Sequence, residues 1–288
     1  MTTAAAPSRT TARLTASDGT VLSLHSWAPE QPARAAVFYV HGIQSHAGWL
    51  FETGPELAAR GVAVHAADRR GSGTSGGPRG HLPSAERILD DLAQTLAAAR
   101  RLTPGVPLTV VGQSFGGSVL AALVTRGQVP LDARLVFCAP ALGQQRARHG
   151  AGAGLATLRD GGGLVTVPLS LADPDYTDVR TYLDFMANDI LMIRQVTAST
   201  RSVMVRLEDV YMRGGTWGER PAASVHFVRP EHDAIIDLDI SWQVLSGLTP
   251  HATEFALPGS GHYVEFSAAR HAYWEWLAAT ATAPGAGS

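Results

Sequence analysis

The segment Gly112-Gln113-Ser114-Phe115-Gly116-Gly117 holds the strongest candidate nucleophile in the sequence. It follows the apolar run Leu108–Val111 and leads into small apolar residues typical of a helix. A serine on a sharp strand-to-helix turn stands exposed at the helix N-terminus, where N–H groups and the helix dipole favour developing negative charge. Glycines on either side let neighbouring chains come close. We therefore predict that Ser114 is a nucleophile for acyl transfer and that the Phe115 N–H helps to bind the oxyanion.

A serine hydroxyl needs a base to take its proton, so a histidine must lie within hydrogen-bond reach. Of the 11 histidines, His262 has the most suitable surroundings, because it follows Gly259-Ser260-Gly261 in a tight loop between a predicted strand and the final predicted helix. A ring in such a loop can reach over the carboxyl edge of a sheet. The sequence therefore predicts His262 as the general base.

The base requires an acceptor for its other ring nitrogen, which fixes the tautomer and the ring orientation. Asp233 follows the predicted strand Ser224–Val228 by a short loop and precedes a helix near Leu238. Asp237 and Asp239 are rivals, but they fall where capping of that helix would explain them. We predict Asp233 as the acid.

A second oxyanion donor is expected from the loop His41–Trp49, which follows the predicted strand ending at Val40. The Ile43 N–H is the predicted partner of the Phe115 N–H. His41 and His46 in this loop could also indicate a metal site. No carboxylate or cysteine shares the loop at ligand spacing, so we expect the two histidines to shape it, and we predict no metal.

The elements that must position these residues alternate between short apolar runs and longer helical patterns. This alternation predicts an α/β fold with a mostly parallel sheet covered by helices. A helix is predicted for Ser84–Leu102, with Ser84 as N-cap, and others for Gly116–Thr125 and Ser267–Ala279; a hairpin is predicted around Ala12–Ala28. The predicted buried strands are Ala35–Val40, Val62–Ala67, Leu108–Gly112, Leu135–Ala139, Ser224–Val228 and Thr253–Leu257.

The regular alternation stops at residues 142–220, which we interpret as a helical cap inserted between core segments 1–141 and 221–288. Four of the five methionines fall in this insertion, and unbranched thioethers suit an adaptable apolar pocket, although they could equally pack the core of the cap itself. The candidate substrate-binding residues are His41, Gln44, Gln113, Met186, Met192, Met204 and Tyr211.

Composition excludes several functions. A formal net charge of −2 gives no electrostatic reason to expect nucleic acid. The sequence contains no lysine, which excludes Schiff-base catalysis, pyridoxal phosphate attachment and a phosphate-binding lysine.

Residues 1–11 lack the pattern of a secretory signal, and no apolar run is long enough to cross a bilayer, so we expect a cytoplasmic protein. We expect the single cysteine, Cys138, to be a buried core thiol.

Gly71-Ser72-Gly73-Thr74-Ser75-Gly76 follows a predicted strand and matches a dinucleotide-binding fingerprint, with Asp90 and Asp91 at about the expected spacing. In that motif the third glycine packs within a helix, whereas here Gly77-Pro78-Arg79-Gly80 continues as a loop. We therefore do not predict nucleotide binding.

Taken together, these motifs resemble the monoacylglycerol lipase and lysophospholipase branch of the α/β-hydrolase superfamily. The resemblance rests on His41-Gly42 with His46, the stretch Asp68–Ser75, the serine turn, Asp233 and Gly261-His262, in that family's order. It implies an eight-stranded sheet, a triad of Ser114, Asp233 and His262, an oxyanion hole at Ile43 and Phe115, and cleavage of carboxylic esters without a cofactor. Such lipases usually have histidine at the position of Gln113, so this sequence departs from the family pattern there. The substrate can therefore be an ester or a thioester of a small apolar or lipid-like compound.

Three alternatives remain at this stage. Dehalogenases and epoxide hydrolases of this fold use an aspartate nucleophile, and the serine argues against both. A serine-dependent C–C hydrolase, acyltransferase or lyase would use the same triad. A non-catalytic ligand-binding member of the fold is a different class. The sequence leaves the oligomeric state, the acyl chain and the leaving group open.

Overall fold

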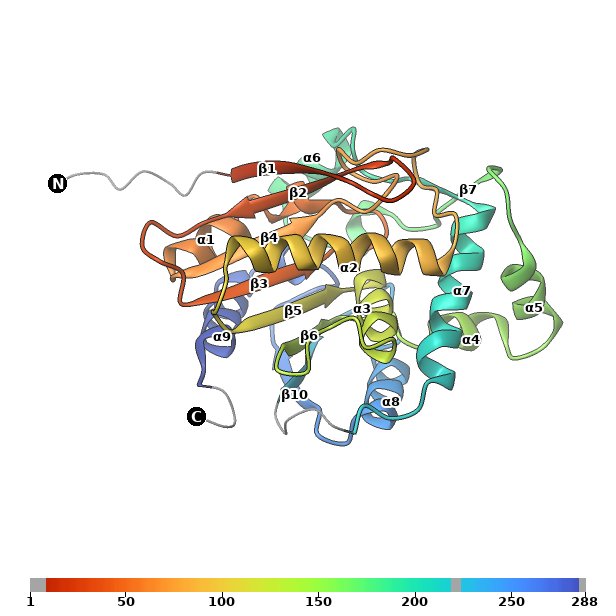
Figure 1. Cartoon of the computed structure of the whole chain (residues 1–288). Helices are drawn as coiled ribbons and strands as arrows, with labels where there is room; N and C mark the ends of the chain where they lie inside the picture. The colour runs from red at the N-terminus through yellow and green to blue at the C-terminus, as the bar shows by residue number, and fades with distance from the viewer. Residues whose placement is uncertain (1–8, 219–223, 285–288) are drawn as a thin grey trace.

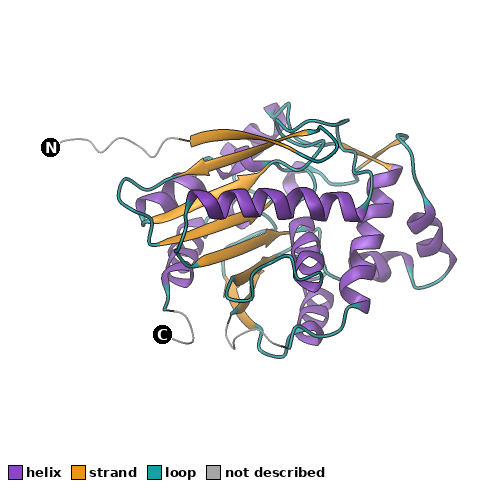
Figure 2. Cartoon of the chain, viewed as in Figure 1, coloured by secondary structure: helices purple, strands orange, loops and turns teal. Residues whose placement is uncertain are grey.

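The computed structural model describes residues 9–218 and 224–284 of the 288-residue chain. A central eight-stranded sheet runs in the order β1-β2-β4-β3-β5-β6-β9-β10, with helices on both faces (Figures 1 and 2). The first two neighbouring pairs are antiparallel and the other five are parallel. The strands are β1 (Arg9–Thr15), β2 (Val21–Trp27), β3 (Ala35–Val40), β4 (Val62–Ala67), β5 (Leu108–Gln113), β6 (Arg134–Cys138), β9 (Val225–Pro230) and β10 (Thr253–Leu257). The predicted mostly parallel α/β sheet is confirmed.

Strand β3 lies inside the sheet and is buried on both faces, which explains its continuous apolar sequence. Ala36, Phe38 and Val40 face the core that lies under α2 and α3, and the alternate residues face the core under α1 and α9. In Figure 1, α2 crosses the front of the sheet. The helices flanking the sheet are α1 (Thr53–Ala59), α2 (Ala85–Leu102), α3 (Phe115–Thr125), α8 (Leu238–Leu248) and α9 (Arg270–Thr282).

Most predicted boundaries agree with the structure within about two residues. Ser84 caps α2 by accepting a hydrogen bond from the Arg87 N–H, as predicted. The final helix differs, because α9 begins at Arg270 rather than Ser267. The Ser267 hydroxyl accepts the Ala269 N–H at 3.2 Å, and this local turn holds the chain out of helical geometry.

Residues 142–218 contribute no strand to the eight-stranded sheet. They contain the expected helices together with a feature that the sequence did not predict, a two-stranded antiparallel sheet of β7 and β8. Three residues per strand are too few for alternation to be recognised. The boundary predicted at 220/221 lies outside the described residues, and the division into core and cap stays a prediction. The elements are α4 (Gln144–His149), α5 (Ala153–Asp160), β7 (Thr166–Pro168), η2 (Asp173–Asp175), α6 (Arg180–Asn188), β8 (Gln195–Thr197) and α7 (Ala198–Arg213).

The parallel strands bring their carboxyl ends to one edge of the sheet. The loops that follow β3, β4, β5, β9 and β10 therefore lie at the same edge, and these loops carry the candidate residues. In Figure 1, α4, α5 and α7 gather at the right, and α7 also packs against α2 and α3. Part of residues 142–218 thus lies beside the core helices.

Candidate active site

Ser114 joins β5 to α3 in a strained conformation. Its φ of 53° and ψ of −120° put a residue with a β-carbon in the region that favours glycine. Three backbone hydrogen bonds hold it there: the Ser114 N–H donates to the Cys138 carbonyl at 3.0 Å, and the Ser114 carbonyl accepts from Gly117 and Ala141, both at 2.9 Å. Strain maintained by several contacts is typical of a functional turn.

The glycines around Ser114 are required by close backbone approaches. A β-carbon on Gly116 would lie 2.0 Å from the Val40 carbonyl oxygen, and one on Gly112 would lie 2.9 Å from the Gly117 Cα. A β-carbon on Gly42 would lie 3.4 Å from the Ser114 Cβ. The loop after β3 therefore packs directly against the serine turn.

His262 and Asp233 form a buried pair. Asp233 Oδ2 accepts a hydrogen bond from His262 Nδ1 at 2.7 Å, and both side chains are about 1% exposed or less. Asp233 Oδ1 accepts the N–H groups of Ile235 and Ile236 at 2.9 and 2.8 Å, which fix the carboxylate. A carboxylate at Nδ1 leaves Nε2 as the proton acceptor. Within the described residues Nε2 is buried and has no hydrogen-bond partner.

The surroundings of His262 tie it to the serine turn. Gln113, which precedes Ser114, donates from Nε2 to the His262 carbonyl at 3.5 Å. The ring of Tyr176, from residues 142–218, meets the His262 ring edge-on with centroids 5.5 Å apart. The rival aspartate Asp237 caps α8 as expected, because its side chain accepts the N–H groups of residues 239 and 240.

The two amides predicted for oxyanion binding come from adjoining segments. Ile43 lies in the loop after β3, and Phe115 is the first residue of α3. Neither amide donates a hydrogen bond to another residue in the part of the chain that the structure describes. Two free N–H groups beside a nucleophile candidate can stabilise an oxyanion.

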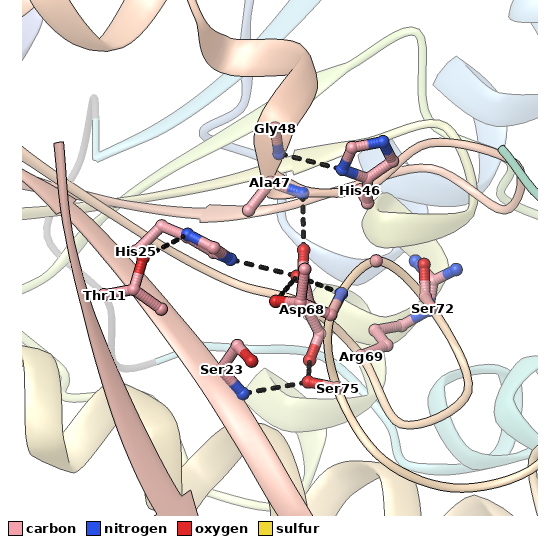
Figure 3. Close-up of polar contacts among 12 residues, drawn as sticks. Thr11, Ser23, His25, His46, Ala47, Gly48, Asp68, Arg69, Ser72 and Ser75 are labelled. Atoms are coloured by element: carbon pink, nitrogen blue, oxygen red, sulfur yellow. Dashed lines mark hydrogen bonds and ion pairs between the residues drawn. The ribbon is translucent and has the colours of Figure 1, made fainter. Parts of the chain in front are cut away.

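Asp68 begins the stretch that contributed to the family resemblance, but the sequence analysis assigned it no role in the site (Figure 3). Its buried carboxylate accepts hydrogen bonds from His25 Nε2 at 2.9 Å, the Ala47 N–H at 2.8 Å and the Thr74 N–H at 2.7 Å. Burial alone would raise its pKa, but these hydrogen bonds and the charge of His25 hold the pKa of Asp68 well below its usual range. Asp68 thus joins β2, the loop after β4 and the loop after β3. The sequence indicated Asp68 by its place directly after a buried strand and at the start of the stretch Asp68–Ser75, but neither signal predicted these hydrogen bonds.

His41 and His46 shape the loop after β3. His41 Nε2 accepts the Arg69 N–H at 3.1 Å and its Nδ1 lies 2.9 Å from the Gly42 carbonyl, so both ring nitrogens have partners inside the protein. Burial, with the charge of Arg69, lowers the pKa of His41, which keeps it neutral. His46 Nε2 donates to the carboxylate of Asp189 at 3.0 Å.

The other predicted substrate-binding residues occupy different surroundings. Gln44 Oε1 accepts the Tyr176 hydroxyl at 2.6 Å, while its Nε2 is buried without a partner among the described residues. Met186 and Met192 pack in an apolar cluster between the core and residues 142–218. The full cluster is Trp49, Tyr176, Tyr182, Met186, Met192, Ile235, Ile236, Tyr263 and Phe266.

Met204 and Tyr211 lie on α7. Met204 packs against the main core, and the Tyr211 hydroxyl accepts the Gly143 N–H at 3.2 Å. Tyr211 also lines a cavity of about 380 Å³ together with residues of α8, and neither Ser114 nor His262 borders it. Substrate binding by these residues stays a prediction.

The loop that resembles a dinucleotide fingerprint has a structural role. The Gly71 N–H donates to the Gly76 carbonyl at 2.9 Å, and the chain remains a loop until α2 begins at Ala85. Asp91 is buried and pairs with Arg70 at 2.8 Å. The segment after Gly76 is thus a loop and not a helix, as expected, and a backbone hydrogen bond closes the turn Gly71–Gly76.

Within the described residues, the arrangement of metal-ligating side chains and the character of the helices bear on metal and membrane binding. No group of three or more histidine, cysteine, aspartate or glutamate side chains is arranged there to hold a metal ion. No helix in the same ranges combines the length and the apolar character needed to cross a membrane. Cys138 is buried and free, as expected.

The sheet order and the serine turn define the α/β-hydrolase fold. The structure aligns with a soluble variant of monoglyceride lipase from Saccharomyces cerevisiae with a TM-score of 0.79 at 14% identity, covering 96% of this chain and 94% of that one. A family model described as serine aminopeptidase, S33, matches residues 31–262. The chain belongs to this family of α/β-hydrolases, which confirms the resemblance drawn from its motifs.

Curated relatives match over shorter stretches. A monoacylglycerol lipase of Mycolicibacterium smegmatis is 34% identical over 100 residues, 35% of this chain and 36% of that one. An uncharacterised abhydrolase domain-containing protein of Dictyostelium discoideum is 38% identical over 104 residues, 36% of this chain and 11% of that one. The chain thus spans about a third or less of the length of these two relatives.

Proposed function

We propose that the protein is a serine hydrolase of the lipase and esterase type that cleaves a carboxylic ester or thioester through an acyl-enzyme. The observation that carries the proposal is the buried Asp233–His262 pair beside the strained turn of Ser114. Backbone strain of this kind is concentrated at active sites, which supports a catalytic role for Ser114. The family match supports the same reaction class.

In the proposed mechanism, His262 Nε2 takes the proton of Ser114 as its oxygen attacks the acyl carbon. The Ile43 and Phe115 amides hold the oxyanion, and Asp233 stabilises the imidazolium. His262 then gives its proton to the departing alcohol or thiol. Water, deprotonated in turn by His262, releases the acid and restores the serine.

In this proposal the described residues 142–218 belong to the cap of the site. Tyr176 contacts both His262 and Gln44, and the apolar cluster around Met186 and Met192 lies between the cap and the core. An apolar wall suits a small apolar or lipid-like acyl or alcohol group. Because His262 Nε2 is buried and the Tyr176 ring packs on the His262 ring, we expect Tyr176 to move when substrate binds.

The test combines active-site labelling with hydrolysis. A fluorophosphonate probe should label the wild type and not Ser114→Ala, whereas Ser118→Ala, one turn further along α3, should still react. Wild-type hydrolysis of p-nitrophenyl esters and thioesters should fall by about 10⁴-fold or more in Ser114→Ala. Labelling of the Ser114→Ala variant, or its undiminished turnover, would refute the assignment.

The substrate panel separates the remaining alternatives. Esters and thioesters graded by acyl length give the preferred chain, and aminoacyl p-nitroanilides test the peptidase activity that the description of the family model suggests. A labelled protein that cleaves none of these would indicate a C–C hydrolase, acyltransferase or lyase using the same residues. An unlabelled protein would indicate a ligand-binding member.

A further inference from the structure

Arg69 is a buried cation whose acceptors are mostly backbone carbonyls of one loop. Its side chain donates from Nη1 to the carbonyls of His41 and Gly42, both at 2.7 Å, and from Nη2 to the carbonyl of Ile43 at 3.1 Å. The residue is 4% exposed. One guanidinium therefore holds three consecutive peptide groups of the loop that follows β3.

No carboxylate pairs with this guanidinium in the part of the chain that the structure describes. Burial lowers the pKa of Arg69 to about 9, with Asp68 opposing the shift, so the side chain stays charged at neutral pH. The neighbouring Arg70 is different, because it forms ion pairs with Asp91 and Asp18, both at 2.8 Å. A buried guanidinium that makes no direct contact with a carboxylate is costly, which is typical of a residue kept for a functional role.

The direction of these hydrogen bonds determines where the opposite ends of the peptides point. In a trans peptide the C=O and the following N–H point in opposite directions, and the described chain has no cis peptide bond. The Gly42 carbonyl points at Arg69, so the Ile43 N–H of the same peptide points away from it. Charge on the carbonyl side also polarises the peptide and strengthens its N–H as a donor.

Arg69 reaches the second proposed oxyanion donor as well. Its guanidinium carbon lies 5.2 Å from the centre of the Phe115 ring, within cation–π distance. Phe115 begins α3, and its side chain is 3% exposed. One side chain thus contacts both residues whose amides would bind the oxyanion.

We propose that Arg69 is the positioning residue of the oxyanion hole: its guanidinium orients the Ile43 amide through three loop carbonyls and fixes Phe115 through its ring. This inference rests on the proposed function, because it assigns a role within that site. Arg69 does not touch the substrate. It acts through the geometry and polarisation of the two amides, and so it favours the tetrahedral intermediate over the bound ester.

The test compares Arg69→Met and Arg69→Lys with the matched control Arg70→Met. The control removes the adjacent buried arginine, whose partners are carboxylates rather than the loop. For Arg69→Met we expect kcat to fall about 100-fold with KM changed less than about threefold, the effect of losing an oxyanion donor. Arg70→Met should lower the Tm while kcat stays within about threefold of the wild type.

Arg69→Lys keeps the buried charge, and it tests the positioning role if Arg69→Met does not fold. A lysine lacks the planar fork that reaches several carbonyls at once, so kcat should remain at least about 10-fold below the wild type. A trifluoromethyl ketone, which forms an anionic tetrahedral adduct with the serine, should lose affinity by about the same factor as kcat in each Arg69 variant. A purely structural role would not produce that proportionality.

The experiments distinguish a failure of the Arg69 inference from a failure of the proposed function. Folded Arg69 variants with wild-type kcat and wild-type inhibition by the ketone would refute the positioning role and leave the proposed function standing. Full rescue by lysine would also refute it, because charge alone would then suffice. A wild type that neither reacts with the fluorophosphonate nor cleaves any ester would refute the proposed function, and this inference with it.

Discussion

The pKa of Glu265, a buried residue close to His262 in the sequence, is set by its surroundings. It lies three residues after His262 and is 1% exposed, and its Oε1 accepts the hydroxyl of Tyr39. Its Oε2 and the hydroxyl of Tyr263 are buried without partners among the described residues. Burial raises the pKa of Glu265 to about 7, and the hydrogen bond from Tyr39 only partly opposes this. The sequence gives no sign of this cluster.

The pKa of Glu265 predicts a pH dependence of stability. Between about pH 4.3, the ordinary pKa of glutamate, and pH 7, the folded protein keeps a proton that the unfolded chain releases. The free energy of unfolding should therefore decrease as the pH rises through this window and level off above it. Glu265→Gln should remove the decrease and be more stable than the wild type at pH 8 by roughly 1–3 kcal/mol. Urea unfolding of both proteins from pH 4.5 to 8 measures this, and parallel curves would contradict it.

Gly116 provides a second test at the residue scale. The alanine β-carbon in Gly116→Ala would lie 2.0 Å from the Val40 carbonyl oxygen, so the serine turn and the end of β3 must separate. We expect a loss of about 3 kcal/mol or more in stability and a large drop in ester hydrolysis.

Gly247→Ala on α8 is the matched control, because nothing lies within 4 Å of its added carbon. It should keep full activity and gain up to about 1 kcal/mol, as expected for alanine in a helix. Thermal unfolding and p-nitrophenyl ester hydrolysis report both effects. A Gly116→Ala variant as stable and active as this control would show that the close approach is unimportant.

At the scale of elements, capping residues and the spacing of apolar residues determine where helices and strands form and which face of each is buried. Helix α2 begins after the Ser84 cap and buries Ile88, Leu89, Leu92 and Leu96 on one face, at the spacing of a helix packed on a sheet. The predicted hairpin is present as β1 and β2, which pair from Arg9 with Trp27 to Thr15 with Val21 at the edge of the sheet. Caps, turns and apolar spacing depend on residues close together in the sequence, so α2 and the hairpin could be predicted from the sequence.

The cap of α2 yields a prediction for this scale. Ser84→Ala removes the acceptor of the Arg87 N–H and should lower the free energy of unfolding by about 1 kcal/mol. Ser84→Asp keeps an acceptor and adds a negative charge at the positive end of the helix, so it should match or exceed the wild type. Chemical denaturation measures both. Equal stability of the two variants would mean that the cap does not contribute.

At the scale of the molecule, many long-range hydrogen bonds and the packing of α7 on α2 and α3 hold residues 142–218 against the core, and one carboxylate takes part in two of these hydrogen bonds. Asp189, directly after α6, accepts hydrogen bonds from His46 Nε2 at 3.0 Å and Trp49 Nε1 at 2.7 Å. Both donors belong to the loop after β3, which also carries Ile43. The loop of the proposed oxyanion hole and the proposed cap are therefore joined through one carboxylate.

Loss of the Asp189 carboxylate should weaken the contact between residues 142–218 and the loop after β3. Asp189→Ala leaves the buried donors of His46 and Trp49 without a partner, and we expect a loss of about 2–3 kcal/mol with faster trypsin cleavage near Arg194. Asp184→Ala is the control, because its ion pair with Arg180 on α6 is exposed and should contribute less than about 0.5 kcal/mol. Equal cleavage rates in the two variants would contradict this role of Asp189.

The sequence by itself determined the strands of the eight-stranded sheet, the sheet class and the serine turn, and it singled out Asp233 and His262 as partners. Each depends on a short pattern: a continuous apolar run, a glycine spacing, or a loop directly after a strand. The pairing of Asp233 with His262 also follows from topology, because parallel strands place their carboxyl-terminal loops at one edge.

Only the tertiary structure decided the roles of Arg69, Asp68 and Asp189. In the sequence Arg69 and Arg70 are adjacent and alike, yet one holds backbone carbonyls and the other pairs with carboxylates. Their partners lie more than 20 residues away along the chain. A hydrogen bond over such a separation depends on how whole loops meet, and no local pattern of residue types encodes that meeting.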